Sequence, residues 1–183
     1  MSVIAVRKHE GKITIACDSQ SSWGNSYKTN TSDNSDKELK NYGKISKVNG
    51  MTIGCAGQCS HIALFEIFTK THKPKSANRD EVLEWIIEFK EWVHKKAQIN
   101  WQDVSLACIL IIENKIFTIY SWLEVVEVKD FDAIGSGMWL AIGAMDMGAN
   151  PIKAVEVASK YVLTCGGETH HLIIDNQNNA NNG

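Results

Sequence analysis

The sequence predicts an α+β domain in which antiparallel strands are covered by helices. Two observations favour this class: short alternating apolar strands are joined by tight turns, and the amphipathic helices come in pairs after runs of strands. The expected order is strands, two helices, strands, two helices and one strand. With 44% hydrophobic and 22% charged residues, the 183-residue chain can bury a substantial core, and we expect a single domain over residues 1–175.

The N-terminal part predicts a hairpin followed by a long polar loop. Residues 2–8 and 13–17 alternate as two strands around the polar turn 9–12. Residues 19–43 contain almost no apolar side chain, so this stretch is expected to form a long surface loop.

A second hairpin and two helices are expected next. Strands 44–48 and 51–55 flank Asn49-Gly50, a strong hairpin signal. A helical pattern opens at Gly57, and a charged linker over 73–80 leads to a helix over 81–97. Trp85 and Trp92 lie seven residues apart on a flank of that helix, where they either enlarge the core face or contact a neighbouring subunit.

The second half predicts a third hairpin, two helices and a closing strand. Strands 104–112 and 115–120 flank Glu113-Asn114, and 125–133 is expected to continue the same sheet. A helix is expected over 139–147, and Asn150-Pro151 starts another that runs to Tyr161. Residues 170–174 form the last strand, and the Asn-rich tail 176–183 is expected to be disordered.

Charge and hydropathy argue against nucleic-acid and membrane partners. The formal net charge is −2, and the basic cluster Lys70, Lys73 and Lys75 is best interpreted as a solvated loop. There is no signal-peptide pattern and no apolar run near the roughly 18 residues of a membrane span, which predicts a cytoplasmic protein.

The five cysteines predict reduced thiols rather than disulfides or a metal site. Their number is odd, and four of them have apolar neighbours: Cys17, Cys55, Cys108 and Cys165. The spacing Cys55-x3-Cys59-x-His61 lacks a second pair of ligands at zinc-finger distance, so no metal and no cofactor is expected.

Five short motifs in order resemble the proteasome β-subunit and HslV family over nearly the whole chain. They are Ser-Val-Ile-Ala-Val at the start, Ile-Ala-Cys-Asp18-Ser19-Gln20, Lys44-Ile45-Ser46-Lys47-Val48, Gly54-Cys55-Ala56-Gly57 and Ile134-Gly135-Ser136-Gly137. The closing Cys165-Gly166-Gly167 is similar to the family's Ser/Thr-Gly-Gly. The resemblance implies a four-layer α-β-β-α sandwich of two antiparallel sheets.

The resemblance also implies a hydrolase whose nucleophile is the N-terminal residue. In the family this residue lies sixteen residues before a buried Asp, and Ser2 and Asp18 have that spacing here. Ser2 therefore becomes the nucleophile after removal of Met1, because matching Met1 instead needs an insertion and supplies no reactive atom.

The implied site residues fit the chemistry of such an enzyme. A free α-amine ordinarily titrates at a pKa of about 7.7–8.0 and can act as the base for its own hydroxyl. Lys44 would favour the deprotonated hydroxyl, Asp18 would pair with Lys44, and Gly57 would present a backbone N–H to the oxyanion. Lys47 competes for the lysine role, but the family pattern fits Lys44 better. Ser136 and Cys165 match the remaining site positions.

The resemblance implies substrate contacts and partners as well. Ser22 matches a position that binds substrate backbone, and Cys55, Cys59 and Ala63 match positions lining a small to medium uncharged pocket. A core role for those three is equally open. The implied substrate is a peptide or unfolded protein, and the implied partners are further copies in a ring and an ATP-dependent unfoldase.

Three features depart from the family pattern. Ser2 replaces the usual Thr, the loop before Lys44 is longer, and Val162 stands where many relatives carry an Asp while Cys165 replaces a hydroxyl. Val162 offers no hydrogen bond and a thiol is a weak donor. Two alternatives to a peptidase therefore stay open: a catalytically silent paralogue that serves as a structural subunit, and an amidohydrolase acting on small amides.

Overall fold

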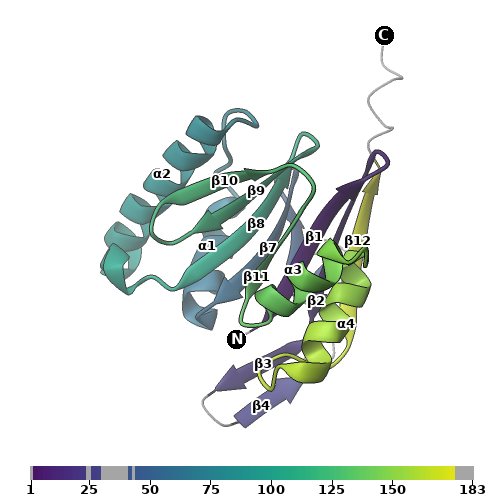
Figure 1. Cartoon of the computed structure of the whole chain (residues 1–183). Helices are drawn as coiled ribbons and strands as arrows, with labels where there is room; N and C mark the ends of the chain where they lie inside the picture. The colour runs from purple at the N-terminus through teal and green to yellow at the C-terminus, as the bar shows by residue number, and fades with distance from the viewer. Residues whose placement is uncertain (1, 24–25, 30–40, 43, 176–183) are drawn as a thin grey trace.

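Two antiparallel sheets lie face to face with helices on their outer sides (Figure 1). The computed structural model describes residues 2–23, 26–29, 41–42 and 44–175, so the predicted tail 176–183 lies outside the described residues. In that part of the chain, the predicted four-layer α-β-β-α architecture is confirmed.

The first sheet carries the start of the chain in its interior. Its strand order is β11-β1-β2-β12, with all neighbours antiparallel. The strands are β1 (Val3–His9), β2 (Lys12–Asp18), β11 (Phe131–Gly135) and β12 (Thr169–Asp175). Helices α3 (Met138–Asp146) and α4 (Pro151–Tyr161) cover its outer face.

The second sheet is built mainly from consecutive hairpins, in the order β10-β9-β8-β7-β6-β5. Its strands are β5 (Asn41–Tyr42), β6 (Ile45–Val48), β7 (Met51–Gly57), β8 (Leu106–Ile112), β9 (Lys115–Tyr120) and β10 (Glu124–Val128). Helices α1 (Cys59–Thr69) and α2 (Arg79–Ala97) pack on its outer face, followed by the short 3-10 helix η1 (Trp101–Asp103).

Three apolar clusters separate the four layers. One lies between α1, α2 and the second sheet, one between the two sheets, and one between the first sheet and α3 and α4. Strand β1 contributes side chains to two of these clusters, because successive side chains of a strand point to opposite faces. Ile4 and Val6 face the second sheet, while Val3 and Ala5 face the helices. Burial of strand residues on both faces accounts for their near-continuous apolar runs.

The three predicted hairpins are confirmed, and each closes through a two-residue turn with positive φ at both positions. The turns are Glu10-Gly11, Asn49-Gly50 and Glu113-Asn114. Such turns match the twist of the flanking strands and fix their register.

Two predicted segments differ from the structure. Residues 19–43 do not form one loop: β3 (Gln20–Trp23) and β4 (Ser26–Thr29) pair as a ribbon, and β5 joins β6, while 24–25, 30–40 and 43 lie outside the described residues. Polar composition misled the prediction because a ribbon is held by backbone hydrogen bonds and needs little apolar burial.

The second difference is the expected strand 125–133, which is two strands in different sheets. Strand β10 pairs with β9, whereas β11 pairs with β1, so the chain crosses from one sheet to the other around Asp130. The backbone N–H of Lys8 donates to the carbonyl of Asp130 at 2.7 Å, and the Arg7 guanidinium lies 3.2 Å from its carboxylate. The apolar pattern continues through the crossing because both strands are buried.

The aromatic flank of α2 belongs to the core. Trp85 is buried, and Trp92 is partly buried against the same cluster, 5.8 Å from Phe68 between ring centroids. The four thiols that the sequence predicts to be buried are buried here, and Cys59 is exposed. No helix in the described ranges is long and apolar enough to cross a membrane.

We predict that Asn150→Ala destabilises the fold by about 1 kcal/mol. The Asn150 side chain accepts a hydrogen bond from the Lys153 N–H at 2.9 Å and caps α4, which packs on the sheet that carries the chain start. Chemical denaturation measures the loss. Asn150→Ser keeps a capping oxygen and should stay near wild type; equal losses in both variants would contradict the cap's contribution.

Candidate active site

A buried carboxylate at the end of β2 organises the predicted site. Asp18 is 0% exposed, and its Oδ1 lies 2.5 Å from Lys44 Nζ, whose side chain is 13% exposed. Lys44 Nζ also donates to the carbonyl of Gln20 at 2.6 Å. The structure thus brings together the Asp and Lys that the sequence pattern paired, and the ion pair compensates a charge that burial alone would strongly disfavour.

The same carboxylate binds two further backbone segments. Asp18 Oδ1 accepts from the N–H of Val3 at 2.9 Å, and Asp18 Oδ2 accepts from the N–H of Gly166 at 3.1 Å. The carbonyl of Gly166 in turn accepts from the N–H of Gln20 at 3.0 Å. Asp18 therefore fixes the residue that follows Ser2, the lysine, and the loop after α4 relative to one another.

Ser2 is buried, and its carbonyl is held by the turn between β11 and α3. The N–H of Gly137 and the hydroxyl of Ser136 both donate to this carbonyl, each at 3.3 Å. Gly135 has φ +91°, and a Cβ there would lie 2.2 Å from the same carbonyl oxygen. Only glycine allows the chain start to approach this turn so closely.

Two side chains, those of Thr164 and Cys165, lie beside the Ser136 hydroxyl. Its Oγ lies 2.8 Å from Thr164 Oγ1 and 3.5 Å from Cys165 Sγ. Burial raises the pKa of the Cys165 thiol, so at neutral pH it stays protonated. Since Ser136 has one proton and donates it to Ser2, Thr164 is the donor in their shared hydrogen bond.

Thr164 is the site residue that the sequence reasoning missed. The available signal was a hydroxyl residue directly before Cys165, where the family hydroxyl is shifted by one position. Val162, the residue at the expected Asp position, ends α4 and packs against the cluster between helices and sheet.

An open cavity of about 460 Å³ lies beside Ser2, between the two sheets. Gly57 and Gln58 at the end of β7, Ser136, and residues from β8 and β9 also line it. Gly57 has φ +143°, and a Cβ there would lie 2.3 Å from the carbonyl oxygen of Ser105. The backbone around the predicted oxyanion position is therefore fixed in a conformation that requires glycine.

Three of the four predicted substrate-contact residues, Cys55, Cys59 and Ala63, lie apart from this cavity. Cys55 packs in the core between α1, α2 and the second sheet, while Cys59 and Ala63 are exposed on α1. Ser22 lies on β3, opposite Tyr27, and its side chain is outside the described part of the structure. Cys55, Cys59 and Ala63 are not among the described residues that line the cavity beside Ser2.

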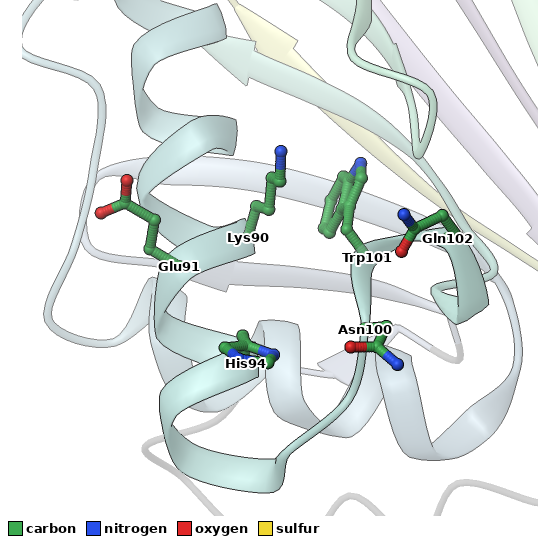
Figure 2. A pocket seen from close by; sticks show the side chains of 6 residues that line it. All are labelled: Lys90, Glu91, His94, Asn100, Trp101 and Gln102. Carbon is green, nitrogen blue, oxygen red and sulfur yellow. The ribbon is translucent and has the colours of Figure 1, made fainter.

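A second cavity, of about 280 Å³, is lined by different residues and differs in chemistry. Lys90, Glu91 and His94 line it from α2, and Asn100, Trp101 and Gln102 from the segment of η1 (Figure 2). His61 is engaged elsewhere, since its Nδ1 accepts from the N–H of Ser105 at 3.0 Å. Among the described residues, no three His, Cys, Asp or Glu side chains are grouped to hold a metal.

The layers, strand orders and covering helices are those of the proteasome β-like fold. Superposition on Thiobacillus denitrificans BPH, solved in complex with epoxomicin, gives a TM-score of 0.79 at 17% identity, covering 94% of this chain and 98% of that one. Eukaryotic HslV from Trypanosoma brucei gives 0.67 at 15% identity, over 94% and 99%. Anbu, the ancestral beta-subunit from Yersinia bercovieri, gives 0.66 at 14%, over 94% and 81%.

No protein-family model and no curated protein matches the sequence. At the identities found among solved structures, the likeness establishes the fold predicted from the motifs.

We predict that Gly135→Ala destabilises the protein more than Gly148→Ala. Both glycines have nearly the same φ, +91° and +94°, so the backbone strain of an added Cβ is matched. At Gly148 the Cβ meets nothing within 4 Å, whereas at Gly135 it clashes with Ser2. The clash should add about 1–3 kcal/mol, measured by denaturant unfolding of both variants. Equal losses of unfolding free energy in the two variants would show that Ser2 does not pack closely against this turn.

Proposed function

We propose that this chain is a peptidase that cleaves peptide bonds with the Ser2 hydroxyl through an acyl-enzyme, after removal of Met1. One observation carries the proposal: a single buried oxygen, Asp18 Oδ1, accepts from both Lys44 Nζ and the N–H of Val3, directly after Ser2. Two hydrogen bonds through Asp18 thereby link the Lys44 ammonium to the backbone next to the nucleophile. Ser2 itself lines a cavity that can admit substrate.

Lys44 supports the deprotonated hydroxyl. Two of its three N–H bonds are used by Asp18 and the carbonyl of Gln20, and the third has no hydrogen-bond partner among the described residues. The ammonium therefore favours an oxyanion at Ser2 and disfavours a proton on the neighbouring α-amine. The neutral amine is then free to act as the base.

The reaction is an acyl transfer. Ser2 Oγ attacks the peptide carbonyl carbon while its proton passes through a water to the α-amine, and the carbonyl π bond opens to an oxyanion near the N–H of Gly57. The C–N bond then breaks, the leaving amine takes that proton, and an ester to Ser2 remains. A water attacks this ester, releases the acid and restores the hydroxyl.

Thr164 positions the chain start in place of the missing carboxylate. Val162 cannot hydrogen-bond through its side chain, but the Thr164 hydroxyl donates to Ser136, which donates to the carbonyl of Ser2. Successive hydroxyls in one chain polarise each other, so each hydrogen bond strengthens the next. The hydroxyl network from Thr164 through Ser136 to the carbonyl of Ser2 is thus continuous.

The structural neighbours and the surface support the proposal further. BPH, whose fold this chain shares, was solved with epoxomicin, which makes that compound a natural probe. Ring assembly and an ATP-dependent unfoldase remain predictions from the resemblance; the exposed side chains of Trp139 and Leu163, 74% and 95% accessible, favour association with other chains.

We predict that purified wild-type protein lacks Met1, hydrolyses unstructured peptides and forms an epoxomicin adduct on Ser2. Ser2→Ala should lower kcat by at least about 10³-fold and abolish the adduct, because the attacking oxygen is gone. Intact-mass spectrometry and peptide-cleavage kinetics give both readouts.

The matched control is Ser76→Ala, in the connection before α2, which should retain wild-type rates. Met1 retained on every molecule, or cleavage that persists in Ser2→Ala, would contradict the proposed nucleophile. No cleavage and no adduct in the wild type would favour a silent structural subunit, and cleavage of small amides alone would favour an amidohydrolase.

We predict that Thr164→Val lowers kcat/KM by about three- to tenfold, the worth of one net hydrogen bond, while Thr164→Ser stays within about twofold. Both variants change the packing, but only Val removes the donor to Ser136. The pH profile of kcat/KM should shift in the Val variant, since the position of the α-amine depends on this chain. Identical profiles and rates for Val and Ser would rule out a role for the hydroxyl.

A further inference from the structure

The floor of the cavity beside Ser2 is a row of residues that the strand register brings together. Ala56 on β7 lies directly opposite Ala107 on β8, and Ala107 lies directly opposite Tyr120 on β9. All three take part in the cluster between the sheets and line the cavity. The methyl groups of Ala56 and Ala107 form a shallow floor, and the ring of Tyr120 forms a wall at one side of it.

The hollow exists because the opposing sheet also carries a small residue here. Deeper in the sandwich, Ile4 packs over Gly54, where a Cβ would come within 3.0 Å of Ile4 Cγ2. Ser2 lies two residues before Ile4, and Ala56 lies two residues after Gly54. Because side chains two apart on a strand point to the same face, Ser2 points toward the space above Ala56. At Gly54 a large side chain, Ile4, fills the space over a glycine. Beside the nucleophile two small residues, Ser2 and Ala56, face each other instead, and the space between the sheets stays open.

The wall is a rigid aromatic pair. The rings of Tyr120 and Trp122 stack with centroids 4.6 Å apart and an interplanar angle of 6°. Trp122 Nε1 donates to the carboxylate of Glu124 at 2.7 Å, which fixes the indole although it is 67% exposed. A flat, preordered aromatic face can contact a ligand side chain with little loss of conformational entropy.

No charged side chain lines this cavity in the described structure, in contrast to the cavity near η1. Its other lining residues are small, polar or apolar, including Ser105, Leu106 and Met138. Partial burial, with the carboxylates of Asp132 and Glu124, raises the pKa of Tyr120, so its hydroxyl is neutral at working pH. The volume, about 460 Å³, lies in the range of ligand pockets.

We infer that this cavity binds a bulky uncharged side chain, aromatic or aliphatic, of a peptide residue next to the scissile bond. The residues that the family pattern suggested for side-chain recognition, Cys55, Cys59 and Ala63, lie outside it. The inference rests on the proposed function only in that it takes Ser2 as the attacking residue.

The test compares cleavage of acetylated peptides that carry Phe, Leu, Gly, Asp or Lys at the residues flanking one bond. Wild type should cleave the Phe and Leu peptides at least about tenfold more efficiently, in kcat/KM, than the Gly, Asp and Lys peptides. Ala107→Leu fills the floor and should reduce kcat/KM for Phe by about tenfold while leaving Gly within about twofold.

The matched control is Ala97→Leu, the same change at an exposed position at the end of α2, which should keep the wild-type preference. Trp122→Ala, at the exposed rim, serves if Ala107→Leu does not fold, and should reduce the preference for Phe over Leu. Unchanged preference in folded Ala107→Leu, or in Trp122→Ala where Ala107→Leu does not fold, would overturn the inference.

Binding without turnover separates this inference from the proposed function. NMR titration of Ser2→Ala with the Phe and Asp peptides should shift the signals of Ala107 and the Trp122 indole for Phe alone. These shifts, together with a wild type that cleaves nothing, would leave the cavity assignment standing and refute the peptidase. Turnover by wild type with no selective shift and no side-chain preference would refute the cavity assignment alone.

Discussion

The pairing of Asp18 with Lys44 is the constraint on which the rest of the site depends. A carboxylate with no solvent exposure must be compensated, and removing one partner of such a buried pair typically costs about 3–5 kcal/mol. Here the carboxylate also accepts two backbone N–H groups, from Val3 and Gly166. Three distant stretches of chain, at Val3, Lys44 and Gly166, are consequently held to one side chain, and the position of Ser2 follows from it.

Small residues shape the space around this charged centre. Gly57 and Gly135 let backbone segments approach closely, and Ala56 and Ala107 leave the intersheet space unfilled beside Ser2. Elsewhere the two sheets interlock mainly through Ile and Val side chains. The same packing rule that fills the core thus leaves a cavity wherever the strand register places small residues opposite one another.

Much of the fold could be predicted because its strongest signals are local. Three two-residue turns fixed the hairpins, the cap at Asn150 fixed the start of α4, and the spacing from Ser2 to Asp18 identified the buried carboxylate. The missed features depend on pairing between distant segments. Composition could not reveal the β3–β4 ribbon, and an unbroken apolar pattern hid the crossing from β10 to β11. Thr164 was missed because a hydroxyl can reach Ser136 from a neighbouring position when the backbone path of the loop changes.

The hydrogen bonds that hold Ser2 join distant parts of the 183-residue chain, since its carbonyl is bound by Ser136, 134 residues away. During synthesis these contacts can form only after the turn between β11 and α3 has left the ribosome. Until then the hairpin partner β2 is the strand of the first sheet that can pair with β1, because β11 and β12 come later in the chain. The late segments of the chain therefore enclose a start that was accessible during synthesis, so the proposed removal of Met1 would come before the site is complete.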